Sequence, residues 1–192
     1  MVRQSSRMLP IGTPAAPFAL PDTVTGRVVA IGDFAASPLL LVVFMCNHCP
    51  FVKHILDGFG AFAREFGARG VAVVAISSND ITSHPDDAPA EMARMARLKG
   101  FTFPYLYDES QEVAKAYQAV CTPDFFLFDR KRRLGYRGQF DASRPGSRVP
   151  VTGADLRAAC EALLGNKAVT QEQLPSVGCS IKWKAGSEPE WA

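Results

Sequence analysis

Residues 39–55 read LLLVVFMCNHCPFVKHI, a stretch that joins an apolar run to a pair of cysteines and the start of a helix. The apolar run, which ends at Cys46, is typical of a strand buried on both faces of a mostly parallel sheet. Pro50 is favoured at the first position of a helix, and apolar side chains then recur at helical spacing as far as Phe66. A buried strand that passes straight into a helix predicts an α/β fold, and it places Cys46 and Cys49 where the strand ends.

The rest of the sequence alternates strand and helix patterns around this junction. A strand, a helix and a second strand in succession form a right-handed βαβ unit, so the sheet is expected to be at least partly parallel, whereas the last two strands form an antiparallel pair. One domain is expected over residues 1–165, with a C-terminal tail over 166–192 that packs on it. The expected elements are a hairpin over 17–31, strands at 71–77, 124–129 and 133–140, and helices that end at 98, 117 and 164.

Composition argues against several classes of protein. With 47% hydrophobic and 21% charged residues, the chain has a globular composition, neither disordered nor membrane-like. The net charge is +2, and the one dense basic run, Arg130–Arg133, falls between two expected strands, so we interpret it as a solvated turn rather than a nucleic-acid site. The longest apolar run is far too short to cross a bilayer, and no secretory signal is recognised. A cytoplasmic protein is therefore expected, in which a disulfide is usually transient and catalytic.

Cys46 and Cys49 together have the features of a reactive thiol centre. Pro50 makes Cys49 the expected N-cap, where the positive end of the helix dipole and unpaired N–H groups favour a thiolate. The positive charge of Lys53 in the first helical turn also favours the thiolate, and so does His48 when it is protonated. We therefore interpret Cys49 as the nucleophile and Cys46 as the partner that resolves it; two ordinary buried cysteines are the alternative.

Three longer stretches resemble one known family. They read GTPAAPFALPDTVTGRVVAIGDF at 12–34, LLVVFMCNHCPFVKHI at 40–55 and FTFPYLYDESQEVAKAYQAVCTPDFFLFD at 101–129. The sequence is similar here to thioredoxin-fold redoxins, most closely to the peroxiredoxin-like proteins of the alkyl hydroperoxide reductase/thiol-specific antioxidant (AhpC/TSA) family. The resemblance implies a thioredoxin-like three-layer α/β sandwich, in which helices flank a mixed central sheet, and an antioxidant redox activity that needs neither cofactor nor metal.

The resemblance also implies roles for residues near the cysteines. It implies that the Thr122–Pro123 bond is cis and packs beside the active cysteine, where such proteins bind an extended substrate backbone. When the strand ends are aligned, Cys49 falls on the first cysteine of the thioredoxin-type CxxC, and Val52 replaces the second. Cys46 stands where peroxiredoxins have a Thr or Ser, and their activating Arg falls near Pro123, so the resemblance implies ancestry more than fast peroxide reduction.

Three further cysteines have to be placed. Cys121 directly precedes Thr122 and is expected near Cys49, either as a second redox partner or as a small core residue. Cys160 lies on the inward face of the last helix and is expected in the core. Cys179 lies in the tail and is interpreted as an exposed thiol, unless the tail crosses the site and lets Cys179 resolve an oxidised Cys49.

These features leave three functional hypotheses. The first is a thiol–disulfide oxidoreductase that acts on a disulfide substrate through Cys49 and Cys46, and that an external thiol reductant such as thioredoxin or glutathione recycles. The second is a weak thiol peroxidase, in which a peroxide oxidises Cys49, alone or with Cys121 or Cys179 as its partner. The third is a non-enzymatic metal-binding module on Cys46, Cys49 and one of His48, His54 or Cys121, although one CxxC supplies only two of the four ligands of structural zinc. Nucleic-acid and membrane partners are not expected, and the oligomeric state stays open.

Overall fold

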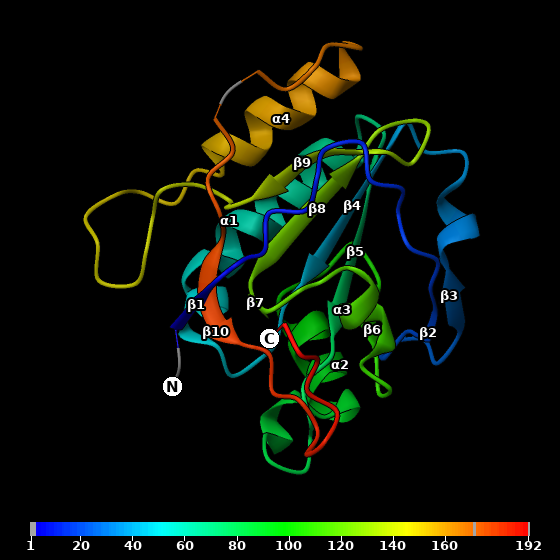
Figure 1. Ribbon diagram of the computed structural model, residues 1–192, viewed down its shortest axis with the longest axis vertical. Coiled ribbons are helices and arrows are strands. Elements are labelled where there is room, and N and C mark those ends of the chain that lie inside the picture. Colours follow the sequence, from blue (N-terminus) through cyan, green and yellow to red (C-terminus); the bar gives the residue numbers. More distant parts are fainter. Residues whose placement is uncertain (1–2, 171, 192) are drawn as a thin grey trace.

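Five strands form the central sheet of the computed structural model, which describes residues 3–170 and 172–191 (Figure 1). In sheet order, the strands are β6 (Tyr105–Tyr107), β5 (Val71–Ser77), β4 (Leu39–Phe44), β8 (Asp124–Phe128) and β9 (Leu134–Gly138). Strands β4, β5 and β6 run parallel, whereas β8 is antiparallel to both β4 and β9. The mixed sheet expected from the sequence is therefore confirmed.

Helices cover both faces of this sheet because β4 is apolar on both sides. Its side chains alternate, so that Leu41 and Val43 belong to one buried cluster, and Leu40 and Val42 belong to the other. The first cluster includes residues of α1 (Pro50–Gly67), α2 (Pro89–Leu98) and α4 (Ala154–Leu164), and the second includes residues of α3 (Glu112–Ala116). The result is a three-layer sandwich with the central sheet in the middle.

A smaller sheet of three strands joins the two ends of the chain. It consists of β1 (Arg3–Ser5), β10 (Val177–Ser180) and β7 (Cys121–Thr122), with β10 in the middle and antiparallel to both neighbours. Figure 1 shows β1 and β10 side by side, although the sequence places them at opposite ends. The expected N-terminal hairpin is also present, as β2 (Ala19–Pro21) and β3 (Val28–Ala30). Two short 3₁₀ helices complete the fold, η1 (Ile31–Phe34) and η2 (Pro85–Asp87).

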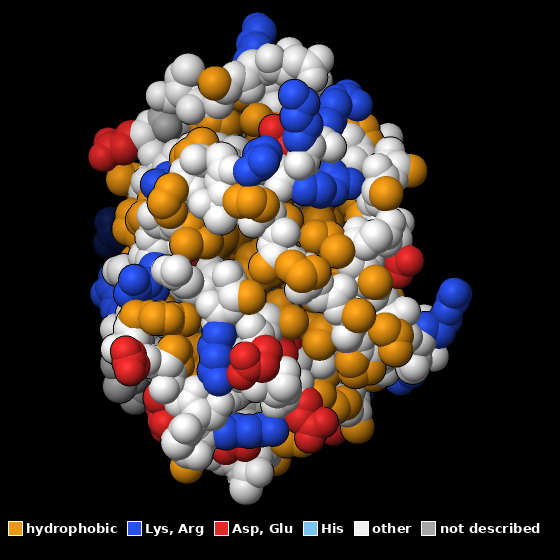
Figure 2. Space-filling model, turned by 45° about the vertical axis from the view of Figure 1, so that its right-hand side comes forward, with side chains coloured by type: hydrophobic (Ala, Val, Ile, Leu, Met, Phe, Trp, Pro, Cys, Tyr) orange, Lys and Arg blue, Asp and Glu red, His pale blue; other side chains and the backbone are white. Residues whose placement is uncertain are grey.

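Charged side chains are distributed unevenly over the face drawn in Figure 2. Lys and Arg side chains are most numerous near the upper end of this face, Asp and Glu lie among further Lys and Arg side chains toward the lower end, and apolar atoms occupy much of the centre. Val28, on the hairpin, is 66% exposed and contributes to the apolar surface of the protein. Within the described ranges, none of the helices combines the length and the apolar character that a bilayer crossing requires.

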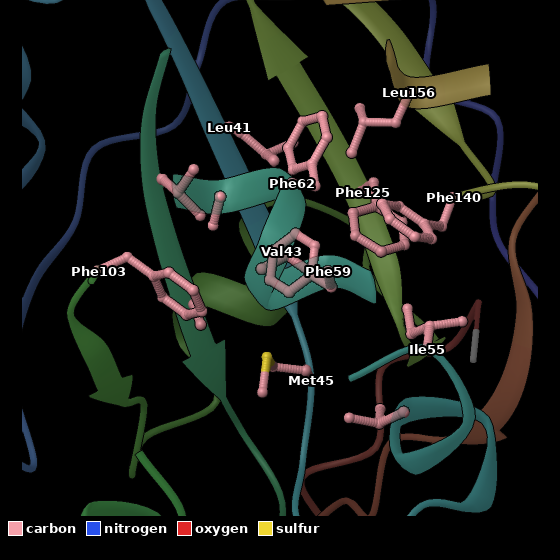
Figure 3. Close-up of a cluster of buried hydrophobic side chains, with 14 of the residues drawn as sticks. Leu41, Val43, Met45, Ile55, Phe59, Phe62, Phe103, Phe125, Phe140 and Leu156 are labelled. Carbon is pink, nitrogen blue, oxygen red and sulfur yellow. The ribbon is translucent and has the colours of Figure 1, made fainter. Parts of the chain in front are cut away.

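A cluster of aromatic side chains holds α1 against the sheet (Figure 3). Phe59 of α1 packs edge-to-face on Phe125 of β8 and on Phe140, with ring centroids 5.6 Å and 5.9 Å apart. Phe62 of the same helix meets Phe140 in a second edge-to-face contact at 5.9 Å. Each such pair contributes about 0.5–1.5 kcal/mol beyond the area that it buries. Because these contacts fix α1 on the sheet, they also fix Cys49, the residue that precedes the helix.

Candidate active site

Cys49 occupies the N-cap of α1, as the sequence predicts. Its backbone is extended (φ −66°, ψ 122°), and Pro50 opens the helix. The residue is completely buried, with 0% of its surface exposed. The backbone N–H of Val52, in the first helical turn, helps to lower the pKa of the Cys49 thiol. The start of the helix therefore favours a negative charge on this sulfur.

Thr122, in β7, contacts both cysteines of the CNHC turn, which we define as Cys46–Cys49. The Cys49 Sγ lies 3.2 Å from the Thr122 carbonyl oxygen, and the Cys46 Sγ lies 3.3 Å from the Thr122 Oγ1. The peptide bond between Thr122 and Pro123 is cis, so this implication of the resemblance is confirmed. The two residues expected to bind a substrate backbone therefore lie directly beside the expected nucleophile.

Cys179 reaches the same place from the C-terminal segment. It is the partner of Thr122 in the antiparallel pair of β10 and β7, and its Sγ lies 2.9 Å from the Cys49 Sγ. A disulfide bond measures about 2.05 Å, so the two sulfurs are in contact without being bonded. The expectation of an exposed thiol is wrong, because Cys179 is only 1% exposed. The tail does cross the site, because β10 pairs with the strand that leads to the cis proline.

Hydrogen bonds rather than solvent set the ionisation of these thiols. The pKa of Cys49 is lowered to about 5, chiefly by a hydrogen bond from the Cys46 thiol, with further donation from Cys179 and Val52, while burial opposes the shift. Burial raises the pKa of Cys46 well above its ordinary value, and the contact with Cys49 adds to this effect. Burial and the contact with Cys49 also raise the pKa of Cys179 to about 12. These shifts favour ionisation of Cys49 ahead of Cys46 and Cys179.

Hydrogen bonds to Asp87, a residue that the sequence did not single out, hold the CNHC turn in place. One carboxylate oxygen of Asp87 accepts the backbone N–H groups of Asn47 and His48, at 2.8 and 3.1 Å. The other oxygen lies 2.6 Å from the His48 Nδ1 and accepts the Asn79 side-chain amide at 2.8 Å. Asp87 is fully buried, and hydrogen bonds from His48 and Asn79 outweigh burial and lower its pKa. A buried carboxylate in a loop rich in Asp gives no sequence signal that separates it from solvated neighbours.

The model of the AhpC/TSA family matches residues 11–137, which is the part of the chain that contains the CNHC turn and the cis proline. The chain belongs to the AhpC/TSA family. Family membership supports a thiol-based redox function for the site just described. A search of curated proteins found no match.

Solved structures support the same fold for this AhpC/TSA protein. An uncharacterized conserved protein from Geobacillus kaustophilus is 49% identical over 96% of this chain and 97% of its own, with a TM-score of 0.94. A hypothetical protein from Sinorhizobium meliloti 1021 is 50% identical over 95% of this chain and 99% of its own, with a TM-score of 0.93. Peroxidoxin BcpB from Mycobacterium tuberculosis is 20% identical over 82% and 98%, with a TM-score of 0.61, and so shares the fold. The thioredoxin-like sandwich is thereby established.

Cys46 departs from the AhpC/TSA pattern and takes a specific place in this site. Peroxiredoxins of the resembled type carry a Thr or Ser there, whereas the Cys46 Sγ of this chain lies 3.3 Å from the Thr122 Oγ1. The Cys46 thiol is 1% exposed and donates to the Cys49 thiolate. Cys46 therefore lies within the same centre as Cys49, and the structure places a third cysteine, Cys179, on the opposite side.

Cys121 and Cys160 are both buried, in different parts of the fold. Cys121 neighbours Thr122 on β7, and its Sγ faces the Pro123 carbonyl oxygen at 4.0 Å. Burial raises the pKa of Cys121 well above its ordinary value. Cys160 lies in α4 within the larger apolar cluster, which confirms the core position expected for it, and burial raises its pKa to about 12. Both remain neutral thiols at ordinary pH.

One group of side chains has the composition of a metal site. The Cys46 Sγ, the His48 Nδ1 and an Asp87 oxygen lie within 4.8 Å of one another. Two ligands of a tetrahedral zinc ion, each about 2.0 Å from it, are about 3.3 Å apart. The His48 Nδ1 and the Asp87 oxygen are separated by 2.6 Å, which is a hydrogen-bond distance. The arrangement therefore fits a hydrogen-bonded pair that positions the turn better than it fits a set of metal ligands.

Proposed function

We propose that this AhpC/TSA protein is a thiol-dependent oxidoreductase that cycles between a dithiol and a Cys49–Cys179 disulfide. The observation that carries the proposal is the 2.9 Å contact between the Cys49 and Cys179 sulfurs, together with the lowering of the Cys49 pKa to about 5. The thiolate is the reactive form of cysteine, and a thiolate in contact with a second thiol needs only a small movement to form a disulfide. The proposal assigns the partner role to Cys179 ahead of Cys46.

The reaction with a disulfide substrate, R–S–S–R, takes two steps. The Cys49 thiolate attacks one substrate sulfur, so that a bond between Cys49 and R–S forms, the substrate S–S bond breaks, and one thiolate leaves. Cys179 then attacks the Cys49 sulfur and expels the second R–S group, which carries away the Cys179 proton. The two protein sulfurs lose two electrons and the substrate gains them. An external thiol reductant of the thioredoxin or glutathione class restores the dithiol, and no cofactor takes part.

The order of these steps follows from the charges in the site. Burial, and then contact with the Cys49 thiolate, raise the pKa of Cys179 to about 12. Once Cys49 has formed a mixed disulfide, its negative charge is gone, so this second contribution disappears. Cys179 consequently becomes easier to deprotonate at the step in which it has to attack. The proposal is set in the cytoplasm, where reductants for such a cycle are available.

Cys46 is the second candidate for the resolving partner. Its thiol donates to the Cys49 thiolate, which is the largest contribution to the low pKa of Cys49. This donor role is lost if Cys46 becomes the disulfide partner, whereas Cys179 can resolve Cys49 while Cys46 stays in place. We therefore assign to Cys46 the role of stabilising the nucleophile.

A thiol peroxidase is the second candidate function, and burial of the nucleophile favours it. Cys49 has 0% exposed surface, and a peroxide is the smallest oxidant that can reach it. The Cys49 thiolate would attack one peroxide oxygen, forming a sulfenic acid and releasing water or an alcohol once a proton is supplied. Cys179 would then displace hydroxide from the Cys49 sulfur, giving the same disulfide and a second water molecule.

Disulfide mapping tests both candidates. The reduced protein and its Cys46→Ser, Cys49→Ser and Cys179→Ser variants are treated with one equivalent of hydroxyethyl disulfide or hydrogen peroxide and analysed by peptide mass spectrometry. We expect a Cys49–Cys179 disulfide in the unmodified protein and in Cys46→Ser, and none in the other two variants. A Cys46–Cys49 disulfide in the unmodified protein would return the partner role to Cys46. Formation of this disulfide by hydrogen peroxide but not by hydroxyethyl disulfide would favour the peroxidase.

A further inference from the structure

Strand β10 fills the position beside the cis proline that an extended substrate would need. The backbone of β7 pairs with β10 in antiparallel register, Cys179 opposite Thr122 and Ser180 opposite Cys121. On its other side β10 pairs with β1, so that Arg3 lies opposite Cys179. The strand therefore has a paired neighbour on each side. A polypeptide that approached Cys49 along β7 would find its hydrogen-bonding partner already taken.

Gly178 lets β10 approach β7 more closely than any other residue would allow. A Cβ atom at this position would lie 1.9 Å from the Thr122 carbonyl oxygen and 2.5 Å from the Thr122 carbonyl carbon. Distances this short cannot be relieved by turning a side chain, because both atoms belong to the backbone. The close approach sets the sulfur of the next residue, Cys179, against Cys49.

Hydrogen bonds on both sides of β10 hold it in this position. Before the strand, the Ser176 N–H donates to the Ser6 Oγ and the Ser6 N–H donates to the Ser176 carbonyl oxygen, both at 2.9 Å. After the strand, the Ile181 N–H donates to the Val120 carbonyl oxygen at 2.8 Å. The Gln111 side chain donates to the Lys182 carbonyl oxygen and accepts from the Lys184 N–H, both at 2.9 Å, and it also donates to the Ser78 carbonyl oxygen at 2.7 Å. These contacts make β10 a fixed part of the site.

The strand encloses the reactive thiols. Cys49 is 0% exposed, and Cys46 and Cys179 are each 1% exposed. The more accessible part of the site is the CNHC turn, where Asn47 and His48 are partly exposed. A small molecule has to pass only this turn, whereas a disulfide within a folded polypeptide must bring two stretches of backbone to the sulfur.

We infer that β10 acts as a built-in occupant of the substrate edge and restricts Cys49 to low-molecular-weight oxidants, excluding polypeptide disulfides. This inference rests on the proposed function, because it names the class of substrate that the Cys49 thiolate attacks. In the excluded reaction, the thiolate would displace one cysteine of the polypeptide disulfide and remain bound to the other. In the proteins that this chain resembles, an extended substrate backbone lies beside the cis proline, and here β10 occupies that position along β7.

The test compares two probes on the reduced full-length protein. The rate at which the Cys49 thiol is consumed is measured by alkylation and mass spectrometry, with hydroxyethyl disulfide as the small probe and insulin as the polypeptide probe. The preference is the rate with the small probe divided by the rate with insulin, both per disulfide. We expect this preference to be at least about tenfold larger for the unmodified protein than for a short cysteine peptide. In Gly178→Ala, where the added Cβ must push β10 away from β7, this preference should shrink by about the same factor.

Two further variants separate displacement of β10 from general damage. Gly67→Ala is the matched control, since nothing lies within 4 Å of the added Cβ, and it should keep the preference of the unmodified protein. Gln111→Asn weakens the anchor after β10 together with the Gln111 hydrogen bond to the Ser78 carbonyl oxygen, and should reduce the preference if Gly178→Ala proves too unstable to assay. Equal reaction with both probes in the unmodified protein, or an unchanged preference in Gly178→Ala and Gln111→Asn, overturns the inference while leaving the proposed function intact. A Cys49 that reacts with neither small disulfides nor peroxide overturns the proposed function itself.

Discussion

The start of α1 and the middle of α4 each bury one cysteine, and the two thiols ionise in opposite ways. Cys49 and Cys160 are both 0% exposed. The pKa of Cys160 is raised to about 12 by burial, whereas that of Cys49 is lowered to about 5 because hydrogen bonds from Cys46 and Cys179 outweigh burial. Exposure therefore does not distinguish the two. The difference lies in donors that converge on Cys49 from the CNHC turn, from β10 and from the first turn of α1.

The largest expected effect is on the oxidation rate, when the two buried cysteines Cys49 and Cys160 are replaced one at a time. Cys49→Ser should lower the rate of oxidation of the protein by hydroxyethyl disulfide by at least about a hundredfold, because the thiolate is the attacking group. Cys160→Ser should leave the rate within about twofold, since no step of the proposed cycle uses that residue. Thiol titration with time measures both. A large loss of rate in Cys160→Ser without unfolding would show that Cys160 also takes part in the reaction.

The start of α1 was predictable from the sequence because its signals are local. The apolar run of β4, Pro50 and the helical spacing after it place Cys49 at the N-cap, and the structure has α1 from Pro50 to Gly67. The cis bond before Pro123 followed from resemblance, and the core position of Cys160 followed from the apolar stripe of its helix.

The donors around Cys49 could not be predicted in the same way. Cys179 is 130 residues away along the chain, in a strand of four residues whose sequence, VGCS, has little strand character. Its place depends on pairing with β1 and β7, and long-range pairing leaves no local pattern. Asp87 lies in η2, and its role depends on the packing of that turn against the CNHC turn.

Removing the main donor to Cys49 should move its titration toward that of an ordinary thiol. A hydrogen bond to a charged group contributes about 1.5–3 kcal/mol, and one pKa unit corresponds to about 1.36 kcal/mol, so Cys46→Ala should raise the Cys49 pKa by roughly one to two units. The measurement is the pH dependence of the iodoacetamide reaction, with a midpoint near 5 expected for the unmodified protein. Cys121→Ala is the control, because Cys121 is not among the donors to Cys49 and the midpoint should stay unchanged. An unchanged midpoint in Cys46→Ala would mean that the helix start or Cys179 carries the effect.

The smallest effect concerns the free energy of unfolding, and its sign follows from the two pKa values. Cys49 has a folded-state pKa of about 5, below the value of about 8.5 for an unfolded thiol, so the unfolded chain binds more protons between these values. The contribution of Cys49 to the free energy of unfolding is then fully present above the unfolded-state pKa and is lost as the pH falls toward 5. The stability difference between the unmodified protein and Cys49→Ser, measured by urea unfolding under reducing conditions, should grow as the pH rises from 5.5 to 8. For Cys160→Ser the difference should change by no more than about 0.2 kcal/mol over this range, because Cys160, with a folded-state pKa of about 12, stays neutral in the folded protein and an unfolded thiol ionises only slightly by pH 8. A constant difference for Cys49→Ser would show that Cys49 is protonated in the folded protein at neutral pH, and the contrast between the two buried cysteines would then fail.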